Sequence, residues 1–110
     1  MGYVLARVQL KYGNENLNRY NTTIPVIADL FALEGVSLRH GWITQFGSLY
    51  EVWDVWEVDD SAHMSRARTS LRSKPEYGEA HKVLAEIIQS EDLRYVESLP
   101  FSPDLATPRN

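Results

Sequence analysis

The stretch HGWITQFGSLYEVWDVW, residues 40–56, gathers ionisable and aromatic side chains that together could do chemistry. His40 can exchange a proton near neutral pH, and Asp54 can act as a general base or hold an imidazole in place. Indole rings suit the walls of a pocket for a flat apolar ligand, and this stretch holds all three tryptophans of the chain, Trp42, Trp53 and Trp56. It therefore indicates a site for a small apolar or aromatic metabolite.

Three further side chains complete the predicted pocket. Arg7, in the first apolar segment, could neutralise an enolate, a phenolate or a carboxylate, and Tyr50 and Arg68 are candidates for the rim. We predict one pocket in which Arg7, His40 and Asp54 carry the chemistry. We expect its ligand to be bound by Trp42, Trp56, Tyr50 and Arg68.

The convergence of these side chains depends on the two strands that would carry them. Alternation predicts strands at residues 36–46 and 50–58, joined by a short turn as an antiparallel hairpin. Even-numbered residues of regular strands share a face, and adjacent antiparallel strands bring such faces together. Gly41 is an exception, because glycine within a strand often marks a bulge or a close backbone approach. A bulge there would move His40 to the opposite face.

Packing alone offers another explanation of the same residues. Aromatic side chains favour strands because they pack well there. Trp53 points away from Trp42 and Trp56, so at least one indole would belong to the core or to a subunit interface. Asp54 could also be the buried partner of Arg7, because buried charges are normally paired.

The sequence lacks the patterns of metal and cofactor sites. It contains no cysteine, which excludes disulfides and zinc–thiolate centres. It has no pair of histidines one helical turn apart and no glycine-rich phosphate loop. We therefore expect no metal and no cofactor. His63 and His81 lie among polar residues, and we expect both at the solvated surface.

Length and charge narrow the class of protein. The 110 residues indicate one domain, and the net charge of −4 argues against binding duplex nucleic acid. No apolar run approaches the roughly 18 residues that span a bilayer, so we expect no membrane partner. The N-terminal segment alternates and carries an early arginine, unlike a signal peptide, so we expect a cytoplasmic protein.

Hydrophobic periodicity predicts the remaining elements. Besides the hairpin they are a strand at 3–12, a helix at 17–35, a helix at 59–74, a second helix from Pro75 and a strand at 93–99. Pro25 lies inside the first helix, where it either kinks the helix or marks a restart at Thr22 or Thr23.

This order of elements is the β-α-β-β-α-β arrangement of a ferredoxin-like α+β fold, with helices on one face of a four-stranded antiparallel sheet. We assign the fold to residues 1–103 and an irregular tail to residues 104–110. The other sheet face would be too apolar for water. A second copy, packed sheet against sheet across a two-fold axis, is the simplest cover, so we predict a homodimer.

The chain resembles the NIPSNAP family over residues 4–103. That family's pattern is a G-x-W-x-T-x-x-G strand and turn, a hairpin partner ending in tryptophan, and an R-x-R-x-x-L helix followed by a proline-led helix. The matching residues are Arg7, Trp42, Thr44, Gly47, Trp56, Arg66, Arg68, Leu71, Lys74, Pro75 and Tyr77. The resemblance implies a dimeric α/β barrel.

The chain departs from the family pattern around the sheet. His40 stands where the family has glycine, and the other departures are Gln9, Tyr50, Asp54 and Val58. If the family has a common ligand, these changes imply a different one here.

Three functions fit these observations. The first is a cofactor-independent enzyme of the isomerase, cyclase or oxygenase type in specialised or catabolic metabolism, by analogy with other dimeric α/β barrels. The second is a non-catalytic binder of the same metabolite, and the third is a protein-interaction module. A cavity between helices and sheet would favour the first two, and a filled core with an exposed apolar stripe the third.

Overall fold

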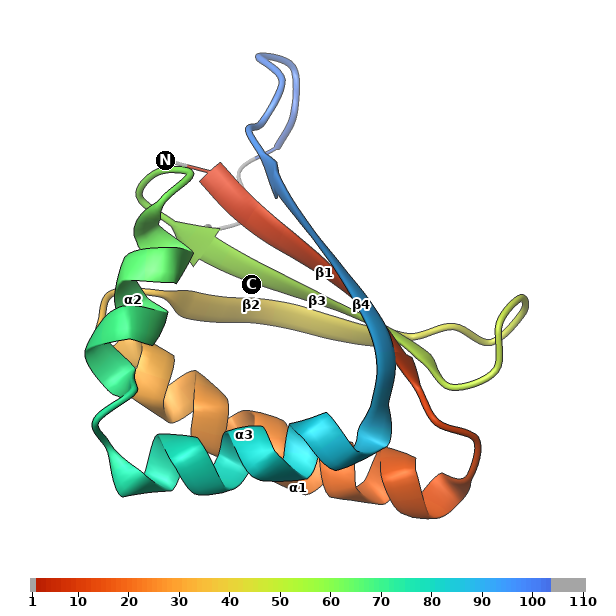
Figure 1. Cartoon of the computed structure of the whole chain (residues 1–110). Helices are drawn as coiled ribbons and strands as arrows, with labels where there is room; N and C mark the ends of the chain where they lie inside the picture. Colours follow the sequence, from red (N-terminus) through yellow and green to blue (C-terminus); the bar gives the residue numbers. More distant parts are fainter. Residues whose placement is uncertain (1, 104–110) are drawn as a thin grey trace, which may run out of the picture.

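The computed structural model describes residues 2–103 and shows three helices on one side of a four-stranded sheet (Figure 1). In chain order the elements are β1 (Gly2–Leu10), α1 (Asn14–Ala32), β2 (Ser37–Ile43), β3 (Glu51–Val58), α2 (His63–Leu71), α3 (Pro75–Ile87) and β4 (Ile88–Val96). The predicted tail lies outside the described residues. Within them, no helix is long and apolar enough to cross a bilayer.

The strands lie in the order β2-β3-β1-β4, and every neighbouring pair is antiparallel. This order confirms the predicted ferredoxin-like α+β fold, in which the first strand takes a central place between the third and the fourth.

Alternation along β1 and β3 gives the sheet two distinct faces. One face turns toward the helices and is buried; it carries Val4, Ala6, Val8 and Leu10 from β1 and Val52, Asp54, Trp56 and Val58 from β3. The opposite face, called here the outer face, carries Tyr3, Leu5, Arg7, Gln9, Glu51, Trp53, Val55 and Glu57. The two clusters of packed core residues lie on the helix side, whereas Tyr3 and Val55 are buried on the outer face.

Helix α1 is continuous through Pro25, so it does not restart at a threonine. Tyr20, Ile27 and Phe31 lie on both sides of the proline and are all buried. Their packing offsets the one backbone donor that proline removes, because most helical stability in a protein comes from tertiary contacts. Gly35, with φ of +80°, then lets the chain leave the helix end, as predicted.

Two predicted boundaries are wrong. Strand β2 ends at Ile43, and residues 44–50 form a loop that projects beyond the sheet (Figure 1) in place of a tight turn. Strand β4 begins at Ile88, directly after α3, and not at residue 93. Its polar start, Gln89 to Asp92, is exposed on an edge of the sheet. A strand exposed on both faces shows no alternation of apolar residues from which to predict it.

A bulge in β2 changes which residues face the helices. Leu38 pairs with Trp56 and His40 with Val55, so Arg39 is the extra residue of the bulge. From this point the parity of β2 is inverted relative to β3. His40 and Trp42 consequently lie on the outer face, and Gly41 on the helix side.

His63 is buried, and the prediction that it lies at the solvated surface is wrong. Its Nδ1 accepts a hydrogen bond of 2.9 Å from the Asp59 amide. Its Nε2 lies 2.7 Å from the carbonyl oxygen of Glu34 and donates to it. The ring thus joins the segment after α1 to the start of α2, which no local sequence pattern reveals.

Replacing His63 with alanine should lower the free energy of unfolding by about 1–3 kcal/mol, because it leaves a partly buried amide and carbonyl without partners. Denaturant unfolding measures this loss. His81→Ala is the control, because His81 is exposed on α3 and should change stability by about 0.5 kcal/mol or less. Equal losses from both variants would show that the His63 bridge contributes nothing.

Candidate functional site

A cavity of about 650 Å³ lies between the helices and the sheet. We call it the helix–sheet cavity. It is lined by Ala6, Tyr20, Ile24, Ile27, Phe31, Asp54, Trp56, Met64, Arg68, Arg72, Tyr77, Gly78, His81, Leu84, Ala85, Ile88, Glu91 and Leu93. Its volume falls in the range of roughly 300–1,000 Å³ that is typical of small-molecule sites.

Aromatic rings from three elements form one wall of the cavity. Phe31 of α1 meets the Trp56 indole edge to face, with ring centroids 5.4 Å apart. It meets the Tyr77 ring of α3 in the same way at 6.2 Å. This mutual packing holds the rings in place, so the wall is formed before any ligand binds.

Asp54 is the buried ionisable group of the cavity, with only 5% of its surface exposed. The Tyr20 hydroxyl of α1 donates a hydrogen bond to its Oδ2. Burial raises the pKa of Asp54, the hydrogen bond from Tyr20 lowers it, and the nearby charge of Glu91 raises it, with a net upward shift. Burial and the Asp54 charge also raise the pKa of Tyr20, so its hydroxyl keeps its proton. Asp54 is therefore an ionisable group whose pKa lies above the ordinary value of a carboxyl, with a protonated hydroxyl beside it.

Gly41 makes room for this carboxyl. It pairs with Asp54 across the hairpin, and a Cβ added at Gly41 would lie 3.2 Å from the Asp54 Oδ1. A side chain there would crowd the carboxyl, whereas glycine lets the β2 backbone lie close to Asp54.

The α2 side of the cavity is cationic. Arg68 and Arg72 lie one helical turn apart and both line the cavity, together with Met64 one turn before them. Neither arginine forms an ion pair with a carboxylate within residues 2–103. Cavity-lining His81, by contrast, packs its ring against Tyr77 at 5.9 Å.

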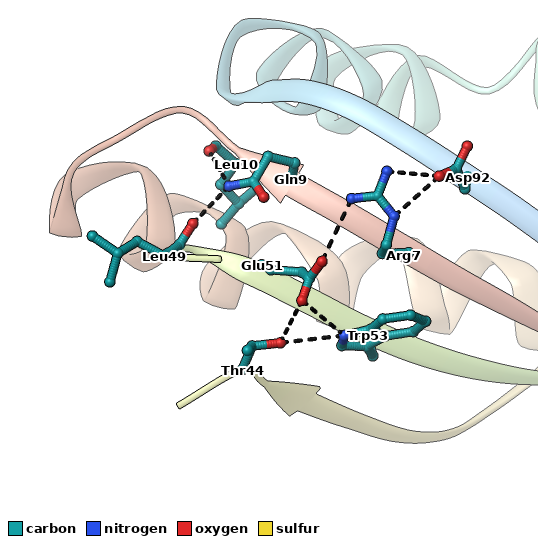
Figure 2. A network of polar contacts seen from close by, with 8 residues as sticks. All are labelled: Arg7, Gln9, Leu10, Thr44, Leu49, Glu51, Trp53 and Asp92. Carbon is teal, nitrogen blue, oxygen red and sulfur yellow. Dashed lines mark hydrogen bonds and ion pairs between the residues drawn. The ribbon is translucent and has the colours of Figure 1, made fainter. Parts of the chain in front are cut away.

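Arg7 lies on the outer face, between Glu51 of β3 and Asp92 of β4 (Figure 2), whereas Asp54 lies on the helix side. Its Nε and Nη2 donate to the Asp92 Oδ2 at 3.0 and 2.6 Å, and its Nη1 lies 3.6 Å from Glu51 Oε2. The hydrogen bond from Arg7 lowers the pKa of Asp92. Glu51 also accepts hydrogen bonds from the Thr44 hydroxyl and the Trp53 indole. The predicted Arg7–Asp54 pair therefore does not exist.

The single predicted pocket is wrong, because the sheet separates its members. Asp54, Trp56 and Arg68 line the helix–sheet cavity. His40 and Trp42 lie beside each other on the outer face, with ring centroids 4.5 Å apart, and Arg7 lies on the same face. The bulge at Arg39 is the physical reason for the positions of His40 and Trp42.

Tyr50 belongs to neither group. It has a φ of +59° at the end of the hairpin loop, and its hydroxyl donates to Asn14 Oδ1 at 3.1 Å. Its ring meets the Tyr12 ring edge to face. The side chain fastens the loop to the start of α1, outside the lining of the cavity.

The cavity also contains residues that the sequence did not single out as site residues: Tyr20, Arg72 and Glu91. Tyr20 follows the apolar spacing of the first helix, which does not distinguish a site residue from a core residue. Arg72 lies one helical turn after Arg68, and this spacing is the signal that could have found it. Within residues 2–103, no group of three acidic or histidine side chains is arranged to hold a metal.

A family model for NIPSNAP matches residues 7–103. This chain belongs to the NIPSNAP family. Of the residues in the NIPSNAP pattern, Trp56, Arg68 and Tyr77 line the helix–sheet cavity, whereas Arg7 and Trp42 lie on the outer face. The NIPSNAP pattern thus contains residues from both faces of the sheet.

Solved structures share the same fold. A NIPSNAP domain protein from Burkholderia xenovorans is 20% identical, with a TM-score of 0.77, and covers 94% of this chain and 100% of its own. A NIPSNAP family protein of unknown function from Agrobacterium tumefaciens is 16% identical, with a TM-score of 0.80, and covers 94% and 92%. A dimeric ferredoxin-like protein from Bacteroides fragilis is 20% identical, with a TM-score of 0.64, and covers 88% and 95%. No curated protein matches the sequence.

The Asp54→Asn variant should be more stable than the wild type at neutral pH. Because the pKa of Asp54 is raised in the folded state, its contribution is fully present below the ordinary value of 3.8 and is lost as pH rises through the folded-state pKa. Asparagine does not ionise, so the variant should avoid that loss. Denaturant unfolding of both proteins between pH 4 and pH 8 should give curves that diverge as pH rises. Parallel curves would contradict the raised pKa.

Proposed function

We propose that this NIPSNAP protein binds a small apolar or aromatic metabolite in the helix–sheet cavity and catalyses a proton transfer on it without a cofactor. One observation carries this proposal: a buried carboxyl, held by a tyrosine hydroxyl and not by a cation, lines a cavity large enough for a metabolite. An unpaired buried carboxyl destabilises a fold, so a purely structural role gives little reason for it.

The chemistry follows from the two oxygens of Asp54. Tyr20 occupies Oδ2, and no side chain or backbone group of residues 2–103 donates to Oδ1. The ionised carboxyl is a stronger base than an exposed aspartate, because its pKa is raised. It takes a proton from a carbon next to a carbonyl of the ligand and returns it to a different atom of the enolate. This proton return completes an isomerisation. If the enolate carbon instead adds to a second carbonyl of the ligand, the proton passes to the new alkoxide and the product is a ring. Neither reaction needs an oxidant or reductant.

Tyr20 positions this base. Its hydroxyl keeps its own proton and stabilises the carboxylate when the substrate proton has returned to carbon. The aromatic wall formed by Phe31, Trp56 and Tyr77 supplies apolar contacts for the body of the ligand and limits the entry of water.

The cavity favours a small-molecule function over a protein-interaction module, because a module of that kind needs no lined hollow beneath its helices. A non-catalytic binder would use the same cavity without turnover. The placement of the Asp54–Tyr20 pair favours the enzyme, because a binder gains nothing from a costly buried carboxyl.

The outer face supports the proposal of a homodimer. An apolar hollow of about 560 Å³ lies on it. The residues that line this hollow include Tyr3, Leu5, Trp42, Trp53, Val55 and Val96. Half of the Trp42 surface, 51%, is exposed. An apolar surface of this kind marks an interface, and a second copy packed sheet against sheet covers it on both molecules at once. The fold neighbour from Bacteroides fragilis is described as dimeric.

Turnover should depend on the Asp54–Tyr20 pair. Once a ligand-stabilisation screen has identified a substrate, Asp54→Asn should lower kcat by roughly 10²–10⁴-fold, the usual contribution of a general base. Binding of the substrate should remain. His40→Ala is the control, because His40 lies on the outer face, and it should leave kcat unchanged. Full activity of Asp54→Asn would show that Asp54 is not the base, and loss of activity in His40→Ala would place the chemistry on the outer face.

Leu5→Glu should dissociate the dimer. Leu5 lies in the middle of the outer face, and a buried charge without a partner is strongly unfavourable in a sheet-to-sheet interface. Sedimentation at micromolar concentration should show a dimer for the wild type and a monomer for the variant. Leu33→Glu, at an exposed position just after α1, should leave the dimer intact. A monomeric wild type would refute the homodimer.

A further inference from the structure

We infer that the ligand of the helix–sheet cavity is an organic anion: a ring-containing acid whose anionic oxygens bind between Arg68 and Arg72. The inference rests on the proposed function, since it concerns the same cavity, and it adds the charge and the orientation of the ligand. Two arginines on one side of a cavity that has an aromatic wall are its starting point.

Three arginines elsewhere in the molecule form close ion pairs, unlike Arg68 and Arg72. A guanidinium nitrogen lies within 3.0 Å of a carboxylate oxygen in Arg7, Arg19 and Arg66. Arg68 and Arg72 have no such carboxylate within residues 2–103. Like charges one helical turn apart also repel each other. An anion placed between the two guanidinium groups removes this repulsion and gains charge-assisted hydrogen bonds.

Among residues 2–103, the acidic residues that line the cavity do not form ion pairs with Arg68 or Arg72. Glu91 on β4 acts on Asp54, whose pKa it raises. Asp54 lies on β3 and Glu91 on β4, whereas Arg68 lies on α2 and Arg72 at its C-terminal end, so the acidic and cationic groups of the cavity come from different elements. A ligand spanning both would place its anion on α2, its ring against the aromatic wall, and its acidic C–H or hydroxyl at Asp54.

Gly78 of α3 keeps the cavity accessible. It lies inside a helix, where glycine is destabilising relative to alanine. A Cβ added there would meet nothing within 4 Å, so no packing contact among the described residues requires glycine. Gly78 lines the cavity, and a larger side chain at this position would project into space that a ligand could use.

Two fluorescent probes with the same ring system test the charge preference. 1-Anilinonaphthalene-8-sulfonate is an anion, and N-phenyl-1-naphthylamine lacks only its sulfonate. The double variant Arg68→Gln/Arg72→Gln should bind the anionic probe about tenfold more weakly or worse, as expected for lost charge-assisted hydrogen bonds. Its affinity for the neutral probe should change by less than about twofold. Arg66→Gln is the matched control, because it removes the same charge from the same helix at an arginine paired with Asp60.

A cavity-filling variant separates two claims: that the cavity is the binding site, and that its ligand is an anion. Gly78→Trp should abolish the binding of both probes, with Ala85→Phe as a second filling variant should the first not fold. If filling blocks both probes and the double arginine variant still binds the anion as tightly as the wild type, the cavity is a binding site and the anion inference is overturned. If both filled variants bind both probes normally, the cavity is not the site and the proposed function falls with it. Circular dichroism confirms the fold of each variant, and the single variants Arg68→Gln and Arg72→Gln replace the double one if it unfolds.

Discussion

The carboxyl group of Asp54 is buried on the helix side of the sheet with a tyrosine hydroxyl beside it and no cation. The local architecture is arranged around this contact. Helix α1 places Tyr20 over β3, and β2 has glycine opposite Asp54, where an added Cβ would lie 3.2 Å from the carboxyl oxygen Oδ1. The burial that raises the pKa of Asp54 also makes the charged form costly, so the group is kept at the expense of stability.

The sheet separates two kinds of surface. Its helix side holds the cavity, where an aromatic wall, a buried acid and two arginines without carboxylate partners meet. Its outer face is apolar toward one end and carries the ion pairs of Arg7 with Glu51 and Asp92 toward the other. The proposed chemistry on one face and the proposed assembly on the other can therefore change independently. This division fits a family whose members share a fold at low sequence identity.

The proposed enzyme and the proposed ligand class place different demands on the same cavity. Proton transfer requires a dry carboxyl whose pKa is raised, which burial near Trp56 and Tyr20 supplies. Recognition of an anion requires cationic groups that are not already paired with a carboxylate, and neither Arg68 nor Arg72 has such a partner within residues 2–103. The cavity can meet both demands because the acid lies on the sheet and the arginines lie on α2 and at its C-terminal end. A reacting molecule would be oriented by its two ends.

The sequence by itself determined the fold class, the order of the elements and the family, because apolar periodicity and short motifs are local information. It also identified Asp54, Trp56 and Arg68, which do line one cavity. Only the tertiary structure decided which further residues join them. One extra residue in β2 inverts the faces of His40 and Trp42, since a shift of one residue moves every side chain of a strand to the other side. Tyr20 reaches Asp54 across 34 residues of sequence, through helix packing that no motif near either residue records.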